Sequence, residues 1–150
     1  MNKTLKFISE IFIFLGFLCL VFDIRYYNMT KELFKDSLDL STKAAVLQID
    51  KDSLKIAQGI FEIEENEAKI AFINMMSLNL KVDKSIVERC MIDYKAINNV
   101  ENYLNPADNK IYYFDKPTFV ATMKFKYNGL LLKKEIVLSN NFAASQLIQR

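Results

Sequence analysis

The chain contains no histidine, and the candidates for chemistry that stand out by their position are carboxylates and two cysteines. That absence removes the commonest general base and the commonest metal ligand. Four glutamates close together invite comparison with a calcium site: Glu62, Glu64, Glu65 and Glu67. Their spacing fits no calcium-binding loop, and acidic residues at a helix start are explained by the helix dipole. We therefore predict no metal site and no cofactor.

The two cysteines lie in different surroundings. Cys19 belongs to a long apolar run, whereas Cys90 falls in the later, mixed part of the chain. We predict that they do not form a disulfide and that each packs as a small apolar residue. The sequence also lacks a glycine-rich phosphate loop, a Cys-x-x-Cys pair and a nucleophile elbow. We expect no catalytic residues, no small-molecule substrate and no enzymatic activity.

Glu10 is the one ionisable side chain within the apolar run at residues 7–22. Burying a carboxylate in hydrocarbon is costly, so an acid at such a position is a candidate functional residue. One interpretation places Glu10 in the headgroup layer, solvated and one helical turn from Lys6. The other pairs Glu10 with a basic group on a neighbouring helix, which would mean assembly within the membrane. Both interpretations stay open.

The apolar run is unfavourable in water and must lie in another environment. Residues 5–24 are close to the ~20 residues that a helix needs to cross a bilayer. Arg25, Tyr26 and Tyr27 follow as an interfacial anchor, and no small-residue cleavage site ends the run. We predict a retained anchor over residues 1–25, with membrane lipid as its partner.

Orientation follows from the charges that flank the anchor. Lys3, Lys6 and the α-amine precede it, and a short basic N-terminus usually stays inside. We therefore predict a single-pass protein of the cell membrane with a cytoplasmic N-terminus. Residues 26–150 would form an extracytoplasmic domain. The net charge is only +2, with both signs interleaved along the chain, so we expect no nucleic-acid partner.

Hydrophobic periodicity predicts the elements that carry this domain. A single helix is expected from residue 5 to about residue 49, and the apolar strip on its outer half must cover either the domain or another chain. A turn at 50–59, a short strand at 60–63 and a second helix at 64–80 should follow. Strands are predicted at 86–87 with 91–96, at 116–127 and at 130–139, and a loop at 100–109. Asn128 and Gly129 indicate a two-residue hairpin turn.

Apolar and polar residues alternate within residues 119–127, so one set of side chains should face the core and the other should face outward. The inward set is Phe119, Ala121, Met123, Phe125 and Tyr127, and the outward set is Val120, Thr122, Lys124 and Lys126. The outward lysines indicate a solvated face. These elements together predict an α+β fold: a long N-terminal membrane-spanning helix, a second helix, and an antiparallel sheet of three to four strands with a C-terminal hairpin.

This layout resembles that of type IV pilin-like proteins. More narrowly, residues 37–50, followed by 64–80, are similar in texture to the TadE-like anchored proteins of Gram-positive Tad-type pilus clusters. In pilins an acid five residues into the mature chain pairs with a neighbouring N-terminus. Glu10 would hold that place if the chain were cleaved before Lys6, although Leu5 stands where pilins carry a small residue.

The resemblance implies a non-enzymatic structural subunit, pseudopilin-like, of a bacterial pilus or secretion apparatus. Its partners would be other proteins of the assembly, including copies of itself. The alternative is an anchored accessory protein of a transport or conjugation channel, whose domain binds a protein partner and does not polymerise.

Overall fold

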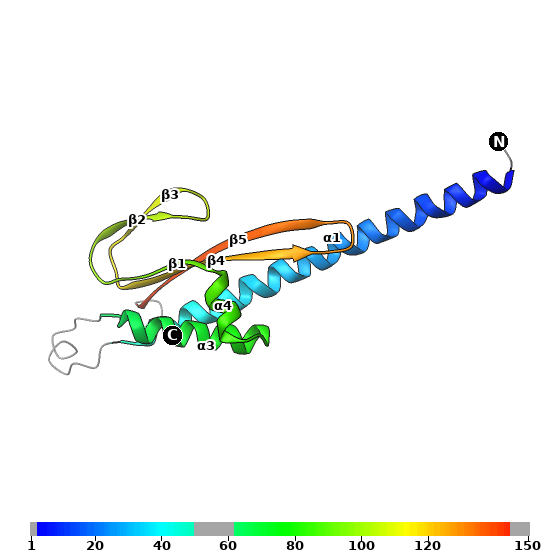
Figure 1. The fold of residues 1–150 in the computed structure, drawn as a ribbon. Coiled ribbons are helices and arrows are strands. Elements are labelled where there is room, and N and C mark those ends of the chain that lie inside the picture. Colours follow the sequence, from blue (N-terminus) through cyan, green and yellow to red (C-terminus); the bar gives the residue numbers. More distant parts are fainter. Residues whose placement is uncertain (1–2, 50–61, 145–150) are drawn as a thin grey trace.

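The computed structural model describes residues 3–49 and 62–144. One helix, α1 (Lys3–Val46), runs for 44 residues, and its N-terminal half projects away from the rest of the molecule (Figure 1). Its continuity follows from the sequence, since Gly16 is its one glycine and no proline interrupts it. At 1.5 Å per residue the helix is roughly 65 Å long. The predicted long helix is confirmed, with its end at Val46.

The remaining elements form a small α+β domain, which confirms the predicted fold class. β4 lies between β1 and β5 in a three-stranded antiparallel sheet, and β2 pairs with β3 in a separate hairpin. In chain order the elements are α3 (Glu65–Leu80), α4 (Lys84–Cys90), β1 (Met91–Ile97), β2 (Glu101–Asn105), β3 (Lys110–Phe114), β4 (Thr118–Asn128) and β5 (Lys133–Ala143).

The main core lies between the helices and one face of the sheet. Phe34 of α1 stacks on Phe125 of β4 with ring centroids 3.7 Å apart, and Phe72 of α3 packs against Phe119 at 5.8 Å. The apolar strip on the outer half of α1 therefore packs on the chain's own domain. Of the two partners that its periodicity left open, the domain or another chain, the structure shows the domain. Buried members of this core include Leu38, Ala45, Val46, Ala68, Phe72, Met76, Phe119 and Met123.

One end of the opposite face of the sheet is covered by the β2–β3 hairpin. Tyr103 packs with Ile97 and Val120 in a second small core, and its hydroxyl donates to Asp93 Oδ2 at 2.7 Å. Burial, together with this bond to Asp93, raises the pKa of Tyr103. The prediction of a loop over residues 100–109 is therefore wrong for its first half, where β2 lies.

That hairpin also corrects the predicted solvated face of β4. Val120 and Thr122 belong to the outward set, yet they are 1% and 0% exposed. Lys124 and Lys126 lie beyond the hairpin and are exposed, as expected. The start of β4 lies between two layers and buries both sets of side chains. Alternation therefore does not predict which of these side chains are exposed to solvent.

Two further local predictions are corrected. Ile86 and Val87 are helical: they lie in α4, where both backbone N–H groups donate to the Asp83 carbonyl. The turn between β4 and β5 spans residues 129–132 and not two residues, because Asn128 pairs with Lys133. Of the predicted strand at 60–63, Ile63 makes a bridge with Ile49, while residues 60–61 and the predicted turn at 50–59 lie outside the described residues.

Candidate functional site

The turn at residues 129–132, called the hairpin tip from here on, is tied to α1 by one carboxylate. Asp23 Oδ1 accepts the backbone N–H of Leu130 at 3.0 Å, and Oδ2 accepts those of Leu131 at 2.5 Å and Leu132 at 2.9 Å. Asp23 is only 4% exposed although it adjoins the apolar half of the helix. Three N–H donors converging on one carboxylate compensate its charge without a cation.

Two more residues fit the hairpin tip to the helix. The Tyr127 hydroxyl donates to the backbone carbonyl of Asp23 at 3.1 Å, and its ring meets that of Tyr27 edge-on at 5.4 Å. Burial, with the nearby charge of Asp23, raises the pKa of Tyr127, so the phenol keeps the proton that it donates. A Cβ added at Gly129 would lie 2.6 Å from Asp23 Oδ1, so only glycine leaves room for the carboxylate.

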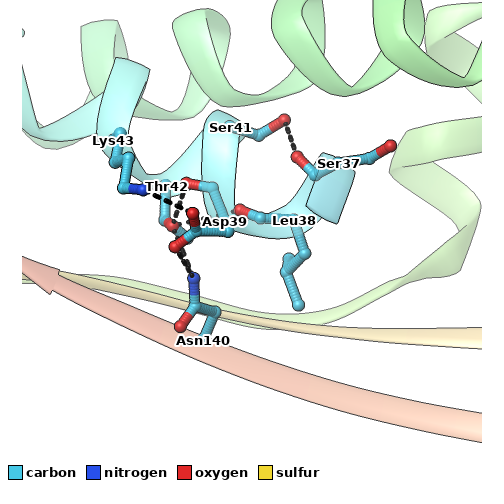
Figure 2. A network of polar contacts seen from close by, with 7 residues as sticks. All are labelled: Ser37, Leu38, Asp39, Ser41, Thr42, Lys43 and Asn140. Atoms are coloured by element: carbon cyan, nitrogen blue, oxygen red, sulfur yellow. Dashed lines mark hydrogen bonds and ion pairs between the residues drawn. The ribbon is translucent and has the colours of Figure 1, made fainter. Parts of the chain in front are cut away.

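A second polar cluster, formed by Ser37, Asp39, Ser41, Thr42, Lys43 and Asn140, joins the outer half of α1 to β5 (Figure 2). Asn140 Nδ2 donates to Thr42 Oγ1 at 3.0 Å and to Asp39 Oδ1 at 3.2 Å. Lys43 forms an ion pair with Asp39 one helical turn away.

The hydroxyls of this cluster are committed to the helix backbone. Ser41 Oγ donates to the Ser37 carbonyl at 2.7 Å, and Thr42 Oγ1 donates to the carbonyls of Leu38 at 3.0 Å and Asp39 at 2.9 Å. A nucleophile needs its proton directed at a base, and neither hydroxyl has that geometry. The cluster satisfies polar groups at a helix–sheet contact, which explains why Ser41 and Thr42 can be fully buried.

Glu10, the one functional residue predicted from sequence, lies far from both groups. It is exposed on the projecting half of α1, and no hydrogen bond or ion pair joins its carboxylate to another described side chain, that of Lys6 included. The structure therefore does not bring Glu10 into a site within one copy of the chain. Its two interpretations, solvation in the headgroup layer or pairing with a second helix, both stay predictions.

The other chemistry-bearing side chains are dispersed. Cys19 and Cys90 are both free thiols. Within residues 3–49 and 62–144, no three acidic or sulfur-bearing side chains come close enough to hold a metal ion. Glu65 and Glu67 occupy the first turn of α3, where the helix dipole favours them.

Asp23 is the residue that sequence reasoning missed. In the sequence, Asp23 is an acid directly after an apolar run, and such a position indicates only the polar end of an anchor. The partners of its carboxylate lie 107 to 109 residues further along the chain, so no local pattern connects them. The contact between Asp23 and the hairpin tip follows only from the fold, in which the β4–β5 hairpin lies along α1 (Figure 1).

Comparison of the chain with protein-family models, with curated proteins and with solved structures found no match. The resemblance to pilin-like proteins therefore stays a prediction. The fold and the site define the chain only as an α+β domain attached to one helix that is long and apolar enough to cross a membrane.

Proposed function

We propose that this chain is a single-pass membrane protein with a cytoplasmic N-terminus, and that it serves as a non-enzymatic, pseudopilin-like subunit of a bacterial surface or secretion assembly. The first half of α1 would lie in the bilayer, and the domain would stand on its outer side. Contacts between the helices of neighbouring subunits would hold the assembly together.

The observation that carries the proposal is the bare apolar half of α1. The most apolar 18-residue window of the helix has a mean hydropathy of 2.3, and only 6% of it is buried by the rest of the chain. Phe12, Ile13 and Phe17 are 70%, 73% and 62% exposed. A surface of this kind is stable in hydrocarbon or against another helix, and not in water.

The two faces of the helix support assembly through the side that carries Glu10. At ~100° per residue, Glu10 and Asp23 are turned from each other by roughly 140°. Asp23 lies on the face that meets the chain's own hairpin, so the Glu10 face is free to meet a second helix. There a carboxylate paired with the basic N-terminus of a neighbour would be compensated.

One observation favours the alternative, an accessory protein whose domain binds a protein partner. Leu104, Ile111 and Tyr113 on the β2–β3 hairpin are 58%, 72% and 66% exposed. Apolar side chains on a projecting hairpin are typical of a protein contact that does not require the membrane helix.

Disulfide cross-linking in native membranes separates these candidates. Phe17 lies within ~20° of Glu10 around the helix, and Cys19 lies ~180° from it. We expect Phe17→Cys, in a Cys19→Ser, Cys90→Ser background, to form dimers on mild oxidation. The matched control, native Cys19 with Cys90→Ser alone, should stay monomeric.

The dimer should depend on Glu10 if the carboxylate is paired. Breaking a buried pair typically costs on the order of 3–5 kcal/mol, so Glu10→Ala should reduce association at least ~100-fold. If neither cysteine variant forms dimers, assembly through α1 is rejected and the accessory-protein alternative is favoured. Release of the chain from membranes by alkaline carbonate would reject the anchor itself.

A further inference from the structure

We infer that the hairpin tip is a second membrane contact, in which Leu130 and Leu131 enter the lipid interface and nearby basic side chains bind anionic headgroups. The inference rests on the proposed anchor. It adds a direct contact between the domain and the bilayer, besides the attachment through the anchor helix.

The position of the hairpin tip carries the first part of the argument. Hydrogen bonds from Leu130, Leu131 and Leu132 to Asp23 hold the tip beside the residue where the apolar run of α1 ends. If the run fills the hydrocarbon core, Asp23 lies at its boundary, and the tip must lie at the same depth. Figure 1 shows the β4–β5 hairpin reaching along α1 toward its projecting half.

The exposed side chains at the tip have the chemistry that this depth requires. Leu130 is 78% exposed and Leu131 is 60% exposed, and neither is covered by another described part of the chain. The backbone N–H groups of Leu130, Leu131 and Leu132 all donate to Asp23, so inserting the tip into lipid leaves none of these three donors without an acceptor. Two adjacent leucines on a turn otherwise have no structural reason to face water.

Basic side chains surround the leucines on the side away from the hydrocarbon. Lys126, Lys133 and Lys134 are exposed and line one shallow hollow next to the tip. Of the acids in this region, Asp23 is compensated by its three N–H donors and Glu135 pairs with Lys124 at 2.8 Å. The remaining positive charge complements anionic lipid headgroups and matches the apolar-plus-basic pattern of interfacial segments.

Tryptophan fluorescence tests the contact cleanly, since the chain contains no tryptophan. Three single variants are reconstituted in vesicles of phosphatidylcholine and phosphatidylglycerol, with and without brominated acyl chains: Leu131→Trp at the tip, Leu104→Trp on β2, and Phe12→Trp in the helix. Bromine quenches only the tryptophans that reach the acyl region. We expect strong quenching for Phe12→Trp, at least about half as much for Leu131→Trp, and none for Leu104→Trp.

The outcomes are distinct. A Leu131→Trp variant that behaves like Leu104→Trp, beside a quenched Phe12→Trp, overturns the lipid contact and assigns the tip to a protein partner, while the anchor stands. An unquenched Phe12→Trp overturns the anchor and this inference together. Adding Lys133→Gln and Lys134→Gln to Leu131→Trp should reduce quenching in anionic vesicles and leave it unchanged in pure phosphatidylcholine; an equal effect in both would reject the headgroup contact.

Discussion

Glu10 and Asp23 are two acids on one helix, and the structure gives them opposite surroundings. Glu10 is exposed on the projecting half of α1 with no described partner, whereas Asp23 is buried beneath three backbone N–H groups. By sequence Glu10 is the more conspicuous, because it interrupts an apolar run. A carboxylate beside a long apolar helix segment thus acquires its role from what the rest of the chain brings to it.

The two acids also differ in what they leave for other molecules. The carboxylate of Asp23 and the backbone N–H groups of the hairpin tip are hydrogen-bonded to each other, so none of these polar groups is left without a partner. The carboxylate of Glu10 has no partner among the described residues, so its charge is left to be compensated by solvent or by another molecule. Asp23 holds the hairpin on its helix, whereas Glu10 stays open.

The largest expected effect comes from removing the buried acid. In Asp23→Ala, the N–H groups of Leu130, Leu131 and Leu132 lose their acceptors. Hydrogen bonds to charged groups are the strong ones, so we expect amide exchange at these positions to rise on the order of 10- to 100-fold. Hydrogen–deuterium exchange by mass spectrometry of the peptide that spans the hairpin tip measures this.

Glu10→Ala is the matched control for that experiment, with the same chemical change on the same helix. It should leave exchange at the hairpin tip unchanged, because Glu10 contacts nothing in the domain. Equal acceleration in the two variants would mean that the tip responds to the charge or folding of α1 as a whole, and the contrast between the acids would fail.

A smaller effect is expected when the acid stays and its space is filled. In Gly129→Ala the new Cβ would meet the Asp23 carboxylate at 2.6 to 2.8 Å, so the hairpin tip must shift away from the helix. Exchange at Leu131 should rise, but by less than in Asp23→Ala, since shifted hydrogen bonds can partly re-form. Gly16→Ala is the control, because nothing lies within 4 Å of a Cβ there. An unaltered tip in Gly129→Ala would contradict the close approach.

The smallest effect should come from Tyr127→Phe. This change removes the hydrogen bond from the Tyr127 hydroxyl to the Asp23 carbonyl, at 3.1 Å, and keeps the ring contact with Tyr27. A single neutral hydrogen bond contributes modestly, so exchange at the hairpin tip should rise less than about tenfold. A loss as large as in Asp23→Ala would show that the tyrosine, and not the carboxylate, holds the hairpin.

The sequence was informative wherever a pattern is local. The 3.6-residue period of α1 and α3 and the alternation in β4 predict those elements, and the turn signal at Asn128 and Gly129 predicts the returning strand β5. The strand β2 was missed because Pro106 and the Asn and Asp residues around it indicate a loop. Asn105 and Asn109 do form the turn, with Asn109 at φ 55, but Tyr103 shows itself as a core residue only when it covers β4.

The site was less predictable than the fold, for a physical reason. Asp23 and Gly129 have ordinary local roles, an anchor end and a turn, and each role explains its residue fully. Their joint role depends on hairpin length: with β4 ending at Asn128, the tip meets the helix at Asp23. Such a coincidence of lengths is a tertiary property that no window of sequence contains.

A spin-label distance measurement tests most directly whether Asp23 fixes the hairpin on the helix. Nitroxides are placed at the exposed positions Arg25 and Asn128, in a Cys19→Ser, Cys90→Ser background in lipid bilayers, and read by electron paramagnetic resonance. We expect one narrow distance distribution that broadens in Asp23→Ala and is unchanged in Glu10→Ala. A distribution that is already broad with Asp23 present, or that the Asp23 change leaves narrow, would contradict it.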